Sequence, residues 1–311
     1  MLDRKTDLSL TSYQAEAVLE AWLGASVHGI QVQPLHGGMI NTVLQLSFDR
    51  PPFQAVIKLA EPGADGPWAL GGEAARLRYL QAHTRFPCPQ VYLEDASRRI
   101  LPYDFLLLER LPGVHFGQVP ANPVAWAQLD GQLAEILLGL HAHTRPTFGP
   151  LEGPGRTQWA DLFLPRLQEV RREPAIARRL SATVLAEVDH AITRAGDLLA
   201  DQGPPTLIHG DVWAGNIIVQ QRQGGWHITG LVDPGAEYAD AEMELAYLES
   251  FGKSRPAFME VYTRQRPLRS GYEVRRMIYW LHTCLIHVWL FGNRSYIQYT
   301  AEVASQLRHL L

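Results

Sequence analysis

A short polar segment between two apolar runs constrains this chain more than any other feature. Residues 209–216 read HGDVWAGN, and they lie between the apolar residues 207–208 and 217–219. A second apolar run follows at residues 226–232 and ends at Asp233. Two short apolar runs separated by glycines are typical of a β-hairpin. The polar residues are therefore expected at one end of a hairpin.

The hairpin brings two oxygen ligands together. If Gly224 and Gly225 form a two-residue turn, Asn216 lies directly opposite Asp233, with Cβ atoms about 5 Å apart. A four-residue turn would shift this register. One amide and one carboxylate suit Mg²⁺, which takes its remaining ligands from water and phosphates. We expect Asn216 and Asp233 to bind Mg²⁺.

Asp211 lies just before this hairpin, at the same end. A carboxylate in that position can accept a hydroxyl proton while a metal ion holds a phosphoryl donor. Taken singly, an aspartate beside a glycine is an ordinary turn residue. The complete set with its spacing favours phosphoryl-transfer chemistry, with Asp211 as the catalytic base.

Lys58 lies within an apolar run, residues 53–59, where an unpaired ammonium would be costly. On the helix predicted at residues 70–81, Glu73 shares a face with Leu77 and Leu80 and so points inward. A Lys58–Glu73 ion pair could hold the lysine against ATP phosphates. The alternative is a solvent-facing lysine and an incidental glutamate, and the pattern favours the pair.

A glycine-containing loop precedes the first predicted strand and comprises Gly37, Gly38, Met39, Ile40 and Asn41. Glycines there would let the backbone approach phosphates closely. Most Gly-Gly pairs are simply turns, and this one is neither a dinucleotide fingerprint nor a P-loop. Its position upstream of the lysine strand makes it a candidate phosphate-covering hairpin.

The remaining patterns predict an α+β chain with a small antiparallel β lobe and a larger helical lobe. Residues 42–48 and 53–59 should pair, and residues 103–109 form a further strand. We place the boundary after residue 110, which gives an ATP-binding lobe at 1–110 and a helical lobe at 111–311 with the catalytic loop and the acceptor site. The helical lobe has apolar periodicity in five segments, at residues 126–140, 159–168, 176–200, 242–251 and 272–291.

Composition and the lengths of apolar segments argue against nucleic-acid-binding, disulfide-stabilised and membrane proteins. The 311 residues carry 28 Lys+Arg against 32 Asp+Glu, which argues against a nucleic-acid-binding protein. The two cysteines, Cys88 and Cys284, have no framework spacing, which indicates a reducing compartment. A signal peptide is not expected, because residues 1–7 mix charges of both signs and no long apolar core follows them. A membrane span is not expected, because the most apolar run, residues 277–291, is too short. We expect a cytoplasmic protein without membrane partners, and the oligomeric state stays open.

Together these segments resemble the aminoglycoside phosphotransferase superfamily, which shares the bilobal protein-kinase-like fold, and most closely its fructosamine (ketosamine) kinases. HGDVWAGN is similar to the HGDLWxGN segment of those kinases, Asp233-Pro234 to their Asp-Pro, and residues 37–41 to their GGxIN loop. Leu140-His141, residues 148–149 and 159–163 and Arg166 also resemble that family's helical-lobe pattern. The resemblance covers most of residues 35–252.

The resemblance implies an ATP- and Mg²⁺-dependent kinase that phosphorylates a hydroxyl of a small molecule. Asp211 would be the base, Asn216 and Asp233 the Mg²⁺ ligands, and Lys58 the phosphate-holding residue paired with Glu73. It also implies a hinge that meets adenine through the backbone, formed by Leu108, Glu109, Arg110 and Leu111.

The acceptor is the less determined part of this interpretation. A fructosamine-like sugar amine is expected first, with an aminoglycoside, choline or homoserine as alternatives. Residues 238–246 read YADAEMELA, without the glycine and arginine that fructosamine kinases carry there. A nucleotide-binding pseudokinase that serves as an interaction module is the alternative of another class.

Four further residues have two interpretations each. Asp240, Glu242 and Glu244 could attract a cationic substrate, but a helix N-cap with acids in its first turn is favoured. Trp213 could stack on a sugar or pack the loop.

No zinc site is predicted from the twelve histidines. An arginine cluster is expected to be a solvated face, and its members are Arg264, Arg266, Arg269, Arg275 and Arg276.

Overall fold

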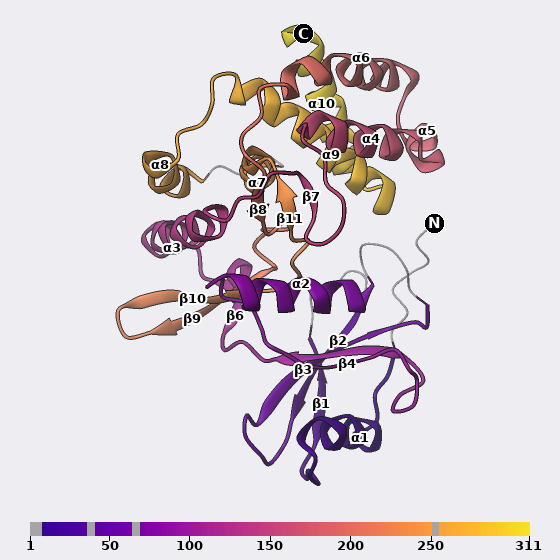
Figure 1. Cartoon of the computed structure of the whole chain (residues 1–311), viewed down its shortest axis with the longest axis vertical. Coiled ribbons are helices and arrows are strands. Elements are labelled where there is room, and N and C mark those ends of the chain that lie inside the picture. Colours follow the sequence, from indigo (N-terminus) through magenta and orange to yellow (C-terminus); the bar gives the residue numbers. More distant parts are fainter. Residues whose placement is uncertain (1–7, 36–40, 64–68, 251–254) are drawn as a thin grey trace. The chain divides into compact units, whose positions relative to one another are not determined.

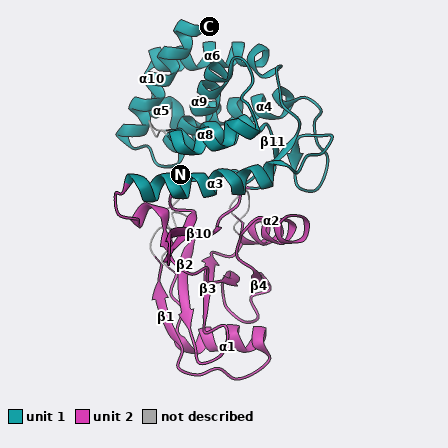
Figure 2. Ribbon diagram, turned by 90° about the vertical axis from the view of Figure 1, so that its left-hand side faces the viewer, with its two compact units in different colours: residues 1–2, 123–213, 236–311 teal, residues 3–122, 214–235 magenta. Residues whose placement is uncertain are grey.

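The structure is a computed structural model that describes residues 8–35, 41–63, 69–250 and 255–311 (Figure 1). The chain forms two compact units, shown in different colours in Figure 2. The sheet unit contains residues 3–122 and 214–235, and the helical unit contains residues 123–213 and 236–311. Each unit has its own hydrophobic core.

The sheet unit is built on a five-stranded antiparallel sheet with the order β1-β2-β3-β5-β4. Its strands are β1 (Gln31–Pro34), β2 (Thr42–Ser47), β3 (Gln54–Ala60), β4 (Val91–Asp95) and β5 (Asp104–Glu109). The predicted pairing of residues 42–48 with 53–59 is confirmed, with Val43 opposite Lys58.

Helices cover both faces of this sheet, because β5 is apolar on both of its sides. Phe105 and Leu107 pack in one cluster with α1 (Ser12–Leu23), while Leu106 and Leu108 pack in another with α2 (Leu70–His83). Successive side chains of a strand point to opposite faces, so one strand contributes to both clusters. The predicted helix at 70–81 is confirmed as α2, whereas α1 was not predicted.

The hairpin that follows residues 209–216 belongs to the sheet unit. It consists of β9 (Ile217–Arg222) and β10 (Gly225–Leu231), and β9 also pairs with β6 (Val114–His115). The Leu231 N–H donates to the Pro87 carbonyl at 2.9 Å, and the Thr229 hydroxyl donates to the Pro112 carbonyl at 2.9 Å. Because of these contacts, the sheet unit continues past the expected boundary at residue 110 to residue 122. It also includes residues 214–235, which are distant in sequence.

One glycine permits the pairing of β6 with β9. Gly113 has φ +119°, and a Cβ built on it would lie 2.1 Å from the carbonyl oxygen of Val219. No side chain fits at that distance, so the two backbones approach closely only with glycine at this position.

Four helices form the centre of the helical unit: α4 (Trp159–Arg172), α6 (Ala182–Leu199), α9 (Tyr272–Leu290) and α10 (Arg294–Leu310). The other helices are α3 (Pro123–His141), α5 (Pro174–Arg179), α7 (Ala241–Leu248) and α8 (Pro256–Gln265), and η1 (Phe116–Gln118) is a 3-10 turn in the sheet unit. A small sheet has the order β7-β11-β8, with β7 (Gly149–Pro150), β8 (Thr206–Ile208) and β11 (Glu237–Ala239). None of the described helices is both long and apolar enough to cross a membrane.

Two predicted helices need correction. The single helix expected at residues 176–200 is divided, because Leu180 is extended and Ser181 caps α6 by accepting the Val184 N–H. On α3, the leucines of the predicted apolar stripe are buried and Ile136 is partly buried, whereas Trp126 is 43% exposed. Helices α8 and α10 were not predicted.

We predict that Gly113→Ala destabilises the protein more than Gly224→Ala. Both glycines have positive φ, but nothing lies within 4 Å of a Cβ at Gly224. The left-handed backbone alone costs about 1–2 kcal/mol, and only Gly113→Ala adds the collision with Val219. Urea unfolding followed by circular dichroism measures both variants. Equal losses of unfolding free energy would contradict the close approach.

Candidate active site

The side chain of Lys58 lies between two carboxylates of the sheet unit. Its Nζ donates to Glu73 Oε1 at 2.8 Å and Oε2 at 3.0 Å, and it also contacts Asp233 Oδ1. Lys58 and Glu73 are buried, whereas the Asp233 side chain is 40% exposed. The predicted inward pair therefore forms, and Asp233 joins it.

Burial disfavours the Lys58 ammonium, yet the charges of Asp233 and Glu73 outweigh burial and raise the lysine pKa. Lys58 thus stays charged at neutral pH. This pairing also explains how a buried lysine is tolerated within β3, because a buried charge requires partners of opposite sign.

Helix α2 also fixes the segment that carries Asp233. Arg76, one turn after Glu73, donates through Nε to the Pro234 carbonyl at 2.6 Å. Asp233 itself has φ +58°, a left-handed conformation in which aspartate is enriched among non-glycine residues. The backbone therefore turns sharply at the end of β10.

The predicted register that placed Asn216 directly opposite Asp233 is wrong. The turn consists of Gln223 and Gly224, and a bulge after Ile228 shifts the pairing by one residue. As a result the Val232 N–H donates to the Asn216 carbonyl at 2.9 Å, and Asp233 follows one residue later. Asn216 is buried, and both residues still lie at the same end of the hairpin.

Asp211 lies in the helical unit, on the loop after β8. Its backbone N–H donates to His209 Nδ1 at 3.2 Å, and its Oδ1 accepts the hydroxyl of Tyr247 at 2.6 Å. The intervening Gly210 has φ +83°, which favours glycine at this position. Trp213, two residues further on, is partly buried.

The sequence pattern favoured a structural role for Glu244 but did not predict its partners. Its buried carboxylate accepts the N–H of Gly210 at 2.6 Å and the N–H of His209 at 3.2 Å, and it hydrogen-bonds His141 Nε2 at 2.8 Å. Burial by itself would raise the pKa of Glu244, but the hydrogen bonds from His141 and Gly210 lower it. An ionised carboxylate thus holds the backbone of the loop that carries Asp211.

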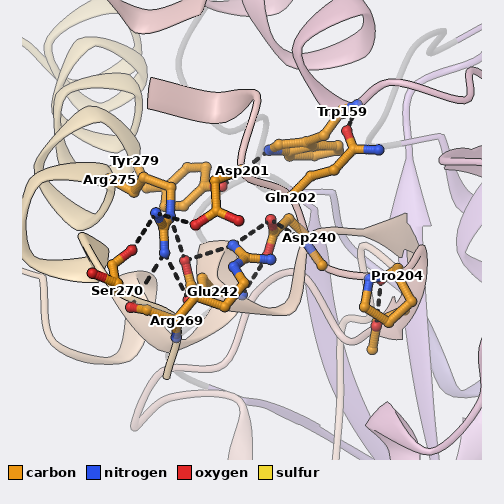
Figure 3. A network of polar contacts seen from close by, with 12 residues as sticks. Trp159, Asp201, Gln202, Pro204, Asp240, Glu242, Arg269, Ser270, Arg275 and Tyr279 are labelled. Carbon is orange, nitrogen blue, oxygen red and sulfur yellow. Dashed lines mark hydrogen bonds and ion pairs between the residues drawn. The ribbon is translucent and has the colours of Figure 1, made fainter. Parts of the chain in front are cut away.

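The acids at the start of α7 face arginines (Figure 3). Asp240 is the N-cap, as favoured, and Arg269 contacts both Asp240 and Glu242 at 2.7 Å. Arg275 bonds Glu242 at 2.7 Å and Asp201 at 3.1 Å. Asp240 and Glu242 are buried and charge-balanced, so they do not form a cation-binding surface.

This network corrects the prediction of a solvated arginine face. Arg275 is buried, and Arg266 donates to the His141 carbonyl at 2.7 Å. Arg276 contacts Glu249 at 3.3 Å, and only Arg264, paired with Glu260 at 2.9 Å, is mostly exposed among the five arginines. Arginine spacing alone does not distinguish a solvated face from buried ion pairs.

The structure describes the four residues expected to form the adenine hinge, but it does not describe most of the glycine loop. Glu109 already donates its N–H to the Gln90 carbonyl at 2.9 Å, so this N–H is not available to adenine. Arg110 donates to Gln45 Oε1 at 3.0 Å, and Leu111 is buried. Leu108 packs in the α2 cluster. Gly37, Gly38, Met39 and Ile40 lie outside the described residues, while Asn41 is partly buried before β2.

Comparisons with known proteins point to one family. The sequence profile of the fructosamine kinase family matches residues 12–310. A probable ketoamine kinase of Synechocystis is 32% identical over 215 residues, which cover 66% of this chain and 68% of that protein. A probable ketoamine kinase of Enterococcus faecium is 38% identical over 208 residues, which cover 62% and 72%.

Solved structures share the fold. A Thermobifida fusca protein assigned as a fructosamine-3-kinase has a TM-score of 0.70 and 22% identity, with 94% of this chain and 98% of that chain covered. A thermostable mutant of aminoglycoside phosphotransferase APH(4)-Ia, in a ternary complex with AMP-PNP and hygromycin B, has a TM-score of 0.68 and 20% identity, with 95% and 98% covered. The predicted kinase-like α+β fold is confirmed.

The profile match spans nearly the whole chain, and both of these relatives are probable ketoamine kinases. These findings confirm the predicted phosphotransferase activity at the level of a small-molecule kinase. The chain therefore belongs to the fructosamine kinase family.

Proposed function

We propose that this kinase uses ATP and Mg²⁺ to phosphorylate a hydroxyl group of a fructosamine-like sugar amine. The observation that carries the proposal is the buried Lys58, bound to both Glu73 and Asp233. A charged lysine held between a helix glutamate and a hairpin aspartate can bind the α- and β-phosphates of ATP. The ketoamine kinase relatives support the substrate class.

The donor set at the end of the hairpin fits Mg²⁺. Asp233 offers a partly exposed carboxylate and Asn216 an amide oxygen, both hard ligands of the kind Mg²⁺ prefers. Asp233 and Asn216 would hold the ion, and its positive charge would offset the negative charge of the ATP phosphates. The left-handed turn at Asp233 and the Arg76–Pro234 bond orient the carboxylate beforehand.

Asp211 would act as the base. The acceptor hydroxyl gives its proton to the Asp211 carboxylate while its oxygen forms a bond to the γ-phosphorus. The bond from that phosphorus to the β–γ bridging oxygen breaks, and ADP leaves. Glu244 keeps the backbone of this loop in place through the N–H groups of His209 and Gly210.

The ion pairs at the start of α7 limit which groups can recognise the amine of the acceptor. A sugar amine is cationic, but Asp240 and Glu242 are already paired with Arg269 and Arg275. Recognition of the amine must therefore come from other groups. The presence of Lys58, a candidate base and both candidate metal ligands argues against a pseudokinase.

We predict that Asp211→Asn lowers turnover by about 10²–10⁴-fold, because positioned base catalysis commonly contributes that much. ATP affinity, measured by calorimetry, should stay near that of the wild type. Asp189→Asn, an exposed aspartate of the same unit, serves as the control. Unchanged turnover in Asp211→Asn would reject the base, and absence of turnover in the wild type with every acceptor would favour the interaction module.

We predict that Asp233→Asn removes most of the Mg²⁺ dependence of ATP binding, because the amide is a weaker ligand than the carboxylate. ATP titrations with Mg²⁺ and with EDTA measure this dependence. Asp95→Asn, at an exposed turn of the same unit, is the matched control. Mg²⁺ enhancement equal to that of the wild type would rule out Asp233 as a ligand.

We predict the highest kcat/KM for a fructosyl-amine in a panel that also contains ribosyl-amines, aminoglycosides, choline and homoserine. ADP release coupled to an indicator reaction measures each acceptor. Preference for an aminoglycoside, choline or homoserine would contradict the sugar-amine assignment and leave the phosphotransferase assignment intact.

A further inference from the structure

Helix α7 contacts three consecutive residues, 209–211, of the loop that carries the proposed base. Glu244 binds the backbone of His209 and Gly210, and Tyr247, three residues later, binds the side chain of Asp211. Residues three apart lie on the same face of a helix. One face of a single helix therefore holds both the backbone of the loop and its carboxylate.

The helix is fixed at both ends. Its first turn is held by Arg269 and Arg275 through Glu242 (Figure 3). At its C-terminal end, the Trp280 indole N–H donates to the Ala246 carbonyl at 2.6 Å, and the Ser250 hydroxyl donates to the Tyr247 carbonyl at 2.7 Å. Groups on a fixed helix are held more accurately than groups on a loop.

The Tyr247 hydroxyl is a donor to Asp211. Burial and then the charge of Asp211 raise the tyrosine pKa well above its usual value, so the hydroxyl keeps its proton. The O···O distance of 2.6 Å is typical of a hydrogen bond to an ionised carboxylate. A carboxylate has about four lone-pair sites, so this bond does not exhaust its capacity to accept a proton.

We propose that Tyr247 is a positioning residue for phosphoryl transfer: its hydroxyl orients Asp211 through Oδ1 so that the carboxylate faces the acceptor. This role rests on the proposed function of Asp211 as the base. Without the hydroxyl, the carboxylate would sample other rotamers, and the fraction of molecules ready to take the proton would fall.

Tyr272 provides a matched control. Its hydroxyl donates to Glu249 Oε2 at 2.9 Å, so it too is a tyrosine bound to a carboxylate in the helical unit. Burial, followed by the charge of Glu249, likewise raises its pKa. Tyr272→Phe therefore removes an equivalent bond that has no contact with Asp211.

The test compares Tyr247→Phe with Tyr272→Phe in the full-length enzyme. We expect Tyr247→Phe to lower kcat by about 10–100-fold, since small misplacements of catalytic groups have effects of this size. KM for ATP should stay unchanged, and Tyr272→Phe should keep kcat within about twofold. A loss of kcat that is equal in both variants, or no loss in Tyr247→Phe, would overturn the proposal.

A double-mutant cycle separates positioning from general structure. If Tyr247 acts through Asp211, Tyr247→Phe should have little further effect on the residual turnover of Asp211→Asn. A full 10–100-fold loss in that background would overturn the positioning role. If Asp211→Asn retains wild-type turnover, the base assignment itself fails, and the two failures are thereby distinguished.

Discussion

The ion pair between Lys58 and two carboxylates is the interaction on which the sheet unit depends. A buried ammonium is stable only beside opposite charge, so Glu73 on α2 and Asp233 after β10 must both lie against β3. This requirement joins a strand, a helix and a hairpin distant in sequence. It also makes the proposed phosphate-binding lysine and the proposed metal ligand parts of one arrangement, which the Arg76–Pro234 bond supports.

A second charged arrangement serves the helical unit. Two arginines neutralise the acids at the start of α7, and the same helix then presents Glu244 and Tyr247 to the catalytic loop. The buried acids are therefore structural at the start of the helix and support the proposed base further along it. Their charges are compensated within the unit, which removes a simple electrostatic explanation for recognition of a cationic acceptor.

The differences between prediction and structure have identifiable physical causes. The hairpin register differs because the turn is Gln223-Gly224 instead of Gly224-Gly225, which moves the pairing by two residues, and the bulge after Ile228 restores one of them. Glycine spacing reveals neither the turn position nor the bulge. The helix expected at 176–200 is divided at Leu180, although the Ser181 N-cap was a readable signal. The prediction of a solvated arginine cluster is wrong because sequence spacing contains no information on which acid each guanidinium meets.

By itself the sequence determined the chemistry: HGDVWAGN with Asp233-Pro234, and a lysine in an apolar strand whose charge required the inward Glu73. These follow from local rules, namely strand alternation, helical periodicity and the cost of a buried charge. Only the tertiary structure decided that Asp233 joins Lys58, that the hairpin belongs to the sheet unit, and that Tyr247 meets Asp211. Those contacts join residues up to 175 positions apart. Packing selects such partners, and no periodicity in the chain encodes them.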